Sequence, residues 1–187
     1  MRLFIAINLP DAERRAIRTA TAAVREAAPD VSWTTEPHLH LTLKFLGDVP
    51  EHAVDPLHDA LHDVASTHRV SKLELGGLGA FPNLRAPRVV WLGVEPDGRL
   101  ELLQHDIESA CAVLGYEVEG RPFRPHITLG RVRKPLSRDA ARTLAATARR
   151  VTYTSTVEPA TVDLMQSQLT PAGPRYSVVA ALPFGER

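Results

Sequence analysis

The sequence predicts a single domain of strands and helices, built from two similar lobes. A short motif occurs twice, as His40-Leu41-Thr42-Leu43 and as His126-Ile127-Thr128-Leu129. Each copy lies in an apolar run that is typical of a β-strand, and other landmarks recur at the same separation along the chain. We therefore expect two related copies, covering about residues 1–70 and 87–157 of the 187.

Each copy of the motif should place a histidine and a threonine on the same face of its strand. Successive side chains of a strand point to opposite faces, so residues two positions apart share one face. A histidine beside a threonine hydroxyl combines a proton-transfer group with a hydrogen-bond donor. Two such pairs facing each other would form a two-sided acid–base site. The apolar residues of the two strands should point into a core: Leu41, Leu43, Phe45, Ile127 and Leu129.

The repeat extends beyond the motif. His40 and His126 are 126 − 40 = 86 positions apart. Solenoid repeats have periods of about 20–50 residues, so this separation indicates one domain of two lobes rather than an array. The same separation relates Thr42 to Thr128, Asp11 to Asp97, the apolar run 3–7 to 89–93, and Glu51 to Ser137.

Length and composition indicate a globular protein of a reducing compartment. At 187 residues and 44% apolar content, the chain can bury a core without disulfides or metals. Cys111 is the only cysteine, so no internal disulfide can form, which favours the cytoplasm; we expect it to pack in the core. No run reaches the length of a membrane span, and we expect no signal sequence, because the apolar run at the N-terminus is too short and no cleavage site follows it. Nothing indicates an obligate protein partner.

The charges balance overall but are unevenly placed. With 22 basic and 22 acidic residues the net charge is zero, which argues against wrapping a long nucleic acid. Residues 121–150 nevertheless contain nine basic residues and one acid, whereas residues 48–63 contain five acids and no Lys or Arg. A solvated helix face explains 138–150, but the basic excess also flanks the second motif, where it could hold an anionic ligand.

The first lobe should begin with a buried strand over 3–9, because that run is apolar throughout. Pro10-Asp11 ends it and caps a helix, whose apolar residues recur at helical spacing as far as Pro29-Asp30. A connection over 33–37 then leads to the first motif strand, expected over about 38–46.

A helix and a strand should complete this lobe after Gly47-Asp48. The helix carries an apolar stripe, the strand covers 70–75, and glycines then predict a turn before a loop. The stripe is Val54, Leu57, Leu61, Val64 and Ala65, the turn glycines are Gly76, Gly77 and Gly79, and the loop is Phe81-Pro82-Asn83.

The second lobe should repeat this order. A strand over 88–94 precedes a helix that Asp97 caps and Gly115 stops. The second motif strand follows over 126–132, and Ser137 caps a further helix that continues through Arg149. Three more strands are expected over 151–157, 161–167 and 175–182, with a turn at 171–174 between the last two.

Two histidines on opposite sides of a phosphorus atom could run an in-line displacement. One would take a proton from water while the other protonates the leaving oxygen, and each threonine hydroxyl could donate to a phosphate oxygen. A single His-x-Thr on a strand is most often only a hydrogen-bonded surface pair. Two copies in related lobes favour a catalytic site.

The two motifs with their flanks resemble those of the 2H phosphoesterase superfamily. Within it, the chain is similar to the RNA 2',3'-cyclic phosphodiesterases, also called the 2'-5' RNA ligase family. The resemblance covers nearly the whole chain. Its segments are His40 to Gly47, Phe123 to Arg131, the opening Arg2-Leu3-Phe4-Ile5-Ala6, Phe81-Pro82, Val90-Trp91-Leu92-Gly93, Gln166-Ser167-Gln168-Leu169 and Gly173-Pro174-Arg175-Tyr176.

The resemblance implies an α+β fold of two pseudo-symmetric lobes, with antiparallel sheets lining a central cleft and helices outside. It also implies hydrolysis of RNA 2',3'-cyclic phosphate ends, or of a cyclic nucleotide, to a 2'-phosphate. The resemblance implies neither a metal nor a cofactor. It also implies a reversible 2'-5' RNA ligation.

By the same resemblance, His40 is the proton donor and His126 the proton acceptor, and Thr42 and Thr128 bind the substrate. Arg131 resembles a phosphate-contacting arginine of the family. Strict alternation would place Arg131 opposite His126, so this role requires a bulge or bend near Gly130.

Other polar residues carry weaker predictions. Lys44 should share the face of His40 and could add positive charge there, or be a solvated strand-end lysine. His38 and His40 have a spacing that can bind metal, but no third ligand is near in sequence, so we favour a loop-end histidine. His58 and His62 are four apart on a helix, where a solvated face is favoured over zinc. Phe81, Phe123 and Trp33 could stack on a base, with core packing as the default.

Two other functions remain open from the sequence. One is a metal-dependent phosphohydrolase that uses His38 and His40. The other is a non-catalytic module that binds RNA ends or nucleotides in the same cleft.

Overall fold

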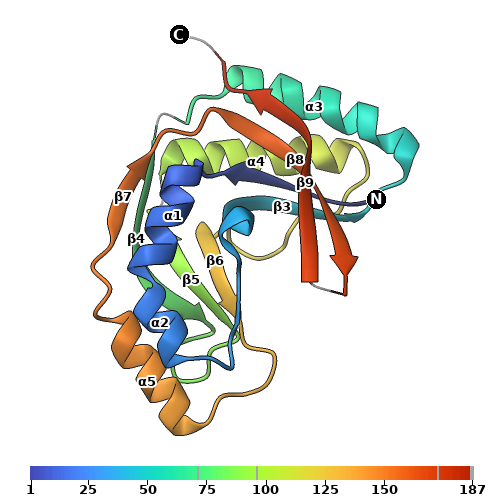
Figure 1. The fold of residues 1–187 in the computed structure, drawn as a ribbon. Coiled ribbons are helices and arrows are strands. Elements are labelled where there is room, and N and C mark those ends of the chain that lie inside the picture. The colour runs from blue at the N-terminus through green and yellow to red at the C-terminus, as the bar shows by residue number, and fades with distance from the viewer. Residues whose placement is uncertain (71, 96, 172, 186–187) are drawn as a thin grey trace.

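A computed structural model describes residues 1–70, 72–95, 97–171 and 173–185. Over these residues the chain forms one nine-stranded sheet in the order β7-β4-β5-β6-β3-β1-β8-β9, with β2 attached to β6 (Figure 1). The strands are β1 Arg2–Asn8, β2 Ser32–Trp33, β3 His40–Asp48, β4 Leu73–Phe81, β5 Val89–Val94, β6 His126–Arg131, β7 Thr154–Val157, β8 Thr161–Thr170 and β9 Gly173–Pro183. Every registered pair of neighbouring strands is antiparallel.

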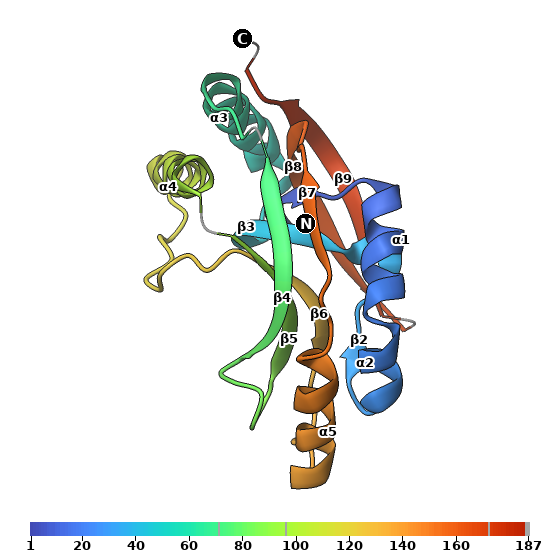
Figure 2. The ribbon, with the colours of Figure 1, turned by 90° about the vertical axis from the view of Figure 1, so that its left-hand side faces the viewer.

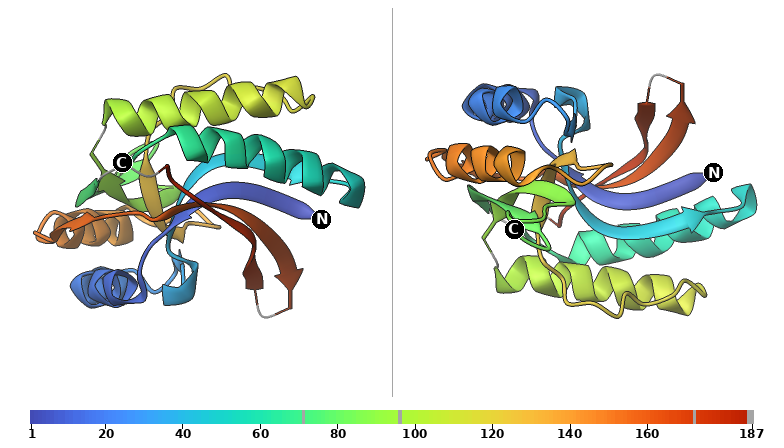
Figure 3. Two further views of the ribbon diagram at one scale, coloured as in Figure 1. Left: turned by 90° about the horizontal axis from the view of Figure 1, so that it is seen from above. Right: turned by 90° about the horizontal axis from the view of Figure 1, so that it is seen from below.

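Helices cover the sheet on both sides. α3 and α4 lie side by side on one side, and α1 and α2 lie on the other, with α2 against α5 (Figure 2). The β8–β9 hairpin projects from the end of the sheet away from α5 (Figure 3). The helices are α1 Asp11–Ala20, α2 Ala22–Ala27, α3 Val54–Thr67, α4 Gly98–Val113 and α5 Arg138–Ala148, with 3-10 turns η1 Glu36–His38 and η2 Glu51–Ala53.

The sheet consists of two halves, β7-β4-β5-β6 and β3-β1-β8-β9, which meet where β6 pairs with β3. β4 follows the first motif strand along the chain but pairs with β5, and β8 follows the second motif strand but pairs with β1. The half β7-β4-β5-β6 therefore comes from one continuous stretch, 73–157, whereas the half β3-β1-β8-β9 combines strands from the two ends of the chain. The predicted α+β fold with antiparallel strands is confirmed. The expected separate sheets are joined into one curled sheet. The limits of the two copies, about 1–70 and 87–157, stay a prediction.

The core lies on the outer side of the motif strands. Leu41 and Ile127 are fully buried, and they belong to one apolar cluster with Leu61 of α3 and Leu103 of α4. Cys111 is also buried there, as predicted, and burial raises the pKa of its thiol to about 11. The motif histidines and threonines alternate with the core residues, so they face the opposite side of the sheet.

Most predicted elements are confirmed with altered ends. The side chains of Asp97 and Ser137 cap α4 and α5 as expected, and α1 begins at Asp11 with Pro10 in the capping position. The expected single helix up to Pro29 is two helices, which break at Thr21, where the buried hydroxyl donates to the carbonyl of Ile17 at 2.8 Å. Such a bond competes with regular helical bonding and bends helices.

The last three strands differ from their predicted limits by a few residues. β7 begins at Thr154 rather than at 151, whereas β8 and β9 are longer than expected. The predicted turn at 171–174 includes Ala172, which lies outside the described residues.

The glycine-rich turn predicted at 76–79 is wrong, because β4 continues through these residues. Gly77 has a positive φ of 73° at a register shift between Leu75 and Leu78, so it belongs to a bulge within the strand. A Cβ on Gly79 would lie 2.3 Å from the ring of Trp91 on the neighbouring strand. These glycines serve the bulge and the packing of Trp91, as glycines inside strands often do.

A bulge in β3 overturns the prediction that Phe45 points into the core. Ile5 of β1 pairs with Lys44 but Ala6 pairs with Thr42, so Leu43 is an extra residue. The alternation therefore reverses after Leu43, and Phe45 is 68% exposed.

The same bulge turns Lys44 away from the motif histidines. Lys44 is 5% exposed, and its ammonium group lies 2.5 Å from a carboxylate oxygen of Glu108 on α4. It also donates to the carbonyl of Glu117 at 2.7 Å. The prediction that Lys44 shares the face of His40 is therefore wrong, and its role is to join β3 to α4.

Removing one partner of this buried pair should be strongly destabilising. Glu108→Leu leaves the ammonium group of Lys44 buried without its carboxylate, so we expect a loss of about 3–5 kcal/mol in the free energy of unfolding. The double variant Lys44→Met/Glu108→Leu should recover most of it. Urea denaturation measures both, and Glu74→Leu, in the exposed pair with Lys72, is the control. Equal losses for Glu108→Leu and Glu74→Leu would contradict this account.

Candidate active site

The contact between β3 and β6 brings the four motif side chains together. Leu41 is registered with Ile127 in antiparallel pairing. One residue further in each direction, His40 lies opposite Thr128 and Thr42 lies opposite His126. All four residues are partly exposed, so each histidine has a threonine from the other strand beside it at an open surface.

Both histidine rings are held by the same kind of hydrogen bond. Nδ1 of His40 lies 2.8 Å from the carbonyl oxygen of His38, and Nδ1 of His126 lies 2.7 Å from that of Arg124. A carbonyl oxygen can only accept, so each Nδ1 carries the hydrogen and donates it. Nε2 of each neutral ring is then left with its lone pair, ready to take a proton.

Aromatic rings flank the two histidines unequally. The centroid of His40 lies 5.0 Å from that of Phe4 on β1 and 5.4 Å from that of Tyr176 on β9. His126 has the ring of Phe81, at the end of β4, 5.0 Å away and nearly perpendicular. The first histidine therefore contacts rings from two strands, β1 and β9, whereas the contact described for the second comes from β4.

Both histidines are poorer bases than a free imidazole. Burial lowers the pKa of His40 to about 4, the hydrogen bond to the His38 carbonyl opposes this, and the positive charges of Arg14 and Arg131 add to the lowering. Burial also lowers the pKa of His126, with the carbonyl of Arg124 opposing and Arg131 adding to the effect. At neutral pH and without a ligand, both rings are therefore neutral.

Arg131 reaches the motif face through a bulge at the expected place. Val90 pairs with Gly130 but Trp91 pairs with Thr128, so Leu129 is the extra residue in β6. The bulge reverses the alternation, and the exposed Arg131 then lies on the side of His126. Its positive charge lowers the pKa of both histidines.

Polar residues that the sequence did not single out lie next to His40. Asn8 of β1 is registered with His40, and its amide donates to the buried carboxylate of Asp163 at 2.6 Å. Arg14 donates to the amide oxygen of Asn8 at 3.0 Å. In the sequence Asn8 only ends an apolar run, and Asp163 is 155 residues away, so no local pattern connects them.

His38 does not share a strand face with His40. It lies on η1, where its Nδ1 is 3.1 Å from the hydroxyl of Thr35. Its backbone carbonyl, rather than its imidazole, is what contacts His40. The metal-binding spacing required both histidines on an extended strand, and the favoured interpretation of His38 as a loop-end histidine is confirmed.

The remaining candidates have other described contacts. His58 and His62 stack 6.4 Å apart on the exposed side of α3, and Trp33 and Phe123 pack against core clusters. In the described part of the chain there is no cluster of three or more His, Cys, Asp or Glu that could hold a metal ion. None of the helices described is long and apolar enough to cross a bilayer.

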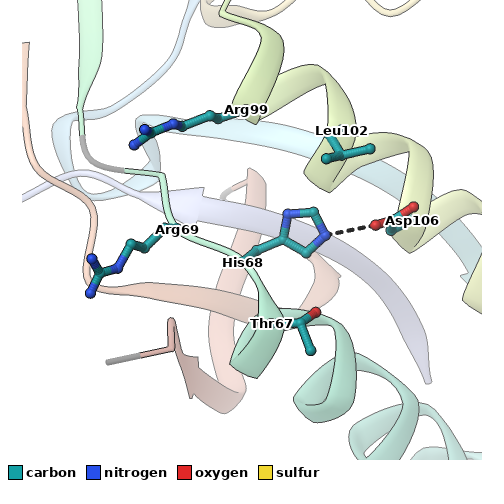
Figure 4. A pocket seen from close by; sticks show the side chains of 6 residues that line it. All are labelled: Thr67, His68, Arg69, Arg99, Leu102 and Asp106. Atoms are coloured by element: carbon teal, nitrogen blue, oxygen red, sulfur yellow. Dashed lines mark hydrogen bonds and ion pairs between the residues drawn. The ribbon is translucent and has the colours of Figure 1, made fainter. Parts of the chain in front are cut away.

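A shallow depression of about 330 Å³ lies elsewhere, between the end of α3 and α4 (Figure 4). His68 faces Asp106 across it, with Nε2 2.7 Å from the carboxylate. This hydrogen bond joins the end of α3 to α4, and the depression contains none of the motif residues. Its lining is Thr67, His68, Arg69, Arg99, Leu102 and Asp106.

The chain is similar to known proteins over most of its length. Residues 9–170 match the model of the 2'-5' RNA ligase superfamily. An RNA 2',3'-cyclic phosphodiesterase of Methanothermobacter thermautotrophicus is 33% identical over 95% of each chain. One of Geobacillus stearothermophilus is 34% identical over 97% of this chain, which spans only 56% of that relative's length.

Solved structures show the same likeness. A crystal structure of a Thermus thermophilus protein superposes with a TM-score of 0.83 at 30% identity, covering 100% of both chains. E. coli LigT complexed with 3'-AMP superposes with a TM-score of 0.72 at 28% identity, covering 99% of this chain and 98% of that one. The family model and the near full-length relatives agree with the arrangement of the two motifs, and the chain belongs to the 2'-5' RNA ligase superfamily.

Proposed function

We propose that this protein hydrolyses RNA ends bearing a 2',3'-cyclic phosphate to a 2'-phosphate, by metal-independent acid–base catalysis. The observation that carries the proposal is the matched pair of histidines on one face of the β3–β6 contact, each with Nδ1 tied to a carbonyl oxygen. The names of the relatives, RNA 2',3'-cyclic phosphodiesterase, support the substrate class.

In the proposed reaction His126 is the proton acceptor and His40 the proton donor. Nε2 of His126 takes a proton from water as the water oxygen attacks phosphorus. The bond from phosphorus to the 3' oxygen breaks on the opposite side, and that oxygen takes a proton from His40. The products are a 2'-phosphate and a free 3'-hydroxyl. The assignment of the two roles follows the family resemblance, because the geometry of the two motifs is nearly symmetric.

Substrate binding is proposed to use the groups between the histidines. The hydroxyls of Thr42 and Thr128 donate to the non-bridging phosphate oxygens, and Arg131 balances their charge, which grows in the transition state. The phosphate anion also favours the charged form of a nearby imidazole, so binding raises the pKa of His40 and lets it enter the complex protonated.

The same site could also carry out a reversible 2'-5' ligation of two RNA ends. If the 5'-hydroxyl of a second RNA replaces water, its attack on the cyclic phosphate forms a 2'-5' linkage and releases the 3' oxygen. We include this ligation in the proposal. We also propose that the protein works in the cytoplasm on RNA or cyclic nucleotides, without an obligate protein partner. The buried, unpaired Cys111 supports a reducing compartment.

Hydrolysis should survive a chelator and leave phosphate on the 2' oxygen. Two histidines supply both proton transfers, so excess EDTA should not lower turnover of a 2',3'-cyclic nucleotide. Phosphorus NMR distinguishes the two products. Loss of activity in EDTA, restored by a divalent ion, would establish the metal-dependent alternative. Predominant 3'-phosphate would mean that the substrate binds the other way round, with the roles of His40 and His126 exchanged.

Each motif histidine should be needed for turnover but not for binding. His40→Ala or His126→Ala should lower kcat by about 10²–10⁴, the usual contribution of a positioned acid or base. Binding of inorganic phosphate should persist, because Thr42, Thr128 and Arg131 remain. His62→Ala is the control. His38→Ala, which keeps the carbonyl that holds His40, should have far less effect than His40→Ala. If the unaltered protein turned over no cyclic phosphate, the enzyme proposal would fail and the non-catalytic module that binds RNA ends or nucleotides would remain.

The two kinetic parameters should differ in their pH optima. In the free protein both histidine pKa values lie below that of an ordinary histidine, so the bell-shaped profile of kcat/KM should peak below about pH 6.5. The bound phosphate raises both pKa values, so kcat should peak at a higher pH. The rising and falling limbs of each pH profile report the coupled titration of His40 and His126, not the pKa of either residue alone. Profiles with the same optimum would contradict the coupling between binding and protonation.

A further inference from the structure

Tyr176 reaches the first motif histidine from the far edge of the sheet. It lies on β9, which pairs with β8 and is separated from β3 by β8 and β1. Its ring centroid is nevertheless 5.4 Å from that of His40, with the two planes at 82°, and 4.7 Å from that of His38. An edge strand therefore places an aromatic ring against the proposed proton donor.

Tyr176 and Phe4 together form an apolar wall beside His40. Their rings lie 5.3 Å apart in an edge-on arrangement, and Phe4 is itself 5.0 Å from His40. Phe4, Ala6 and Met165 form a small buried cluster, and Tyr176 packs against it. The two rings thus cover one side of the imidazole.

We propose that Tyr176 is a positioning residue that holds water away from His40 through its aromatic ring, and thereby makes the protonated form of His40 a stronger acid. The inference rests on the proposed function only for the role of His40 as donor. The ring contacts themselves do not depend on that role.

The physical reason is the poor solvation of an imidazolium ion beside apolar rings. Burial disfavours the charged form of a histidine, so the proton is held less tightly and is transferred more readily to the 3' oxygen. Burial is also the largest cause of the low pKa of about 4 at His40. The substrate phosphate offsets this cost in the complex, because it supplies the negative charge that the apolar wall lacks.

The charged and titratable groups around His40 come from several elements. Arg14 of α1, His38 of η1 and Arg131 of β6 each lower the pKa of His40 by charge repulsion. Asp163 of β8 is separated from His40 by Asn8, to which it is bonded. Substitution of Tyr176 removes none of these groups, so the change that it causes comes from loss of the ring, which contacts His40 and His38.

His126 provides an internal comparison. Phe81 is its aromatic neighbour, at 5.0 Å and 86°, and it lies in the other half of the sheet. If ring contact sets the acidity of each histidine, Tyr176 should affect His40 alone and Phe81 should affect His126 alone.

The test is a pH titration of the histidine rings in the ligand-free protein, followed by NMR of ¹⁵N-labelled imidazoles. His40→Asn and His126→Asn assign the two signals. Tyr176→Ala should raise the protonated fraction of His40 at about pH 6 by roughly tenfold, the effect of losing part of a burial shift. Tyr176→Phe, which keeps the ring, should leave that fraction unchanged.

Two further variants make the test specific. Phe81→Ala should raise the protonated fraction of His126 and not that of His40. Val178→Ala, in the same strand as Tyr176, should change neither. Thermal unfolding checks that each variant is folded; if Tyr176→Ala is not, Tyr176→Leu should give a smaller change in the same direction.

The proposal is overturned if Tyr176→Ala leaves the titration of His40 unchanged, or if Tyr176→Phe changes it as much as Tyr176→Ala does. These outcomes do not depend on turnover, so they are distinct from failure of the proposed reaction. Where the protein is active, Tyr176→Ala should also move the kcat/KM profile for a 2',3'-cyclic nucleotide to higher pH, while Val178→Ala should not. A fall in activity at every pH without that movement would indicate a merely structural role.

Discussion

The short contact between β3 and β6 is the interaction on which the site depends. It is registered at a single pair, Leu41 with Ile127, and both side chains are completely buried beneath the sheet. Because the alternation of a strand is strict over one residue, burying these two side chains forces the histidines and threonines to the opposite face. The apolar core therefore assembles the proposed catalytic groups from two distant parts of the chain.

Matching bulges then give the two halves different chemistry. Leu43 and Leu129, 129 − 43 = 86 residues apart, are the extra residues in β3 and β6. After its bulge β3 buries Lys44 against Glu108, whereas β6 buries Gly130 close to Trp33, where a Cβ would lie 2.7 Å from the indole ring. The exposed residue that follows is Phe45 in one half and Arg131 in the other. The same kind of bulge thus exposes an aromatic ring on β3 and a cation on β6.

The unequal surroundings of the two histidines matter for a reaction that needs one acid and one base. Both rings have the same tautomer, because each Nδ1 donates to a carbonyl oxygen two residues earlier. They differ in their neighbours, since His40 contacts Phe4 and Tyr176 and is also near Arg14. Environment rather than sequence motif therefore separates the two rings, which is the usual way that paired titratable groups acquire distinct roles.

The sequence by itself determined the repeated motif, the faces of its strands, most elements and the family, because these depend on local periodicity and on residue identity. It also indicated that Arg131 would need a bulge near Gly130. The tertiary structure decided which residues the bulges turn over, so that Lys44 is buried, Phe45 is exposed and the glycines of β4 accommodate Trp91. It also decided that Tyr176, 136 positions after His40 (176 − 40), lies against it. Such contacts depend on the pairing order of strands far apart in the chain, which no local pattern encodes.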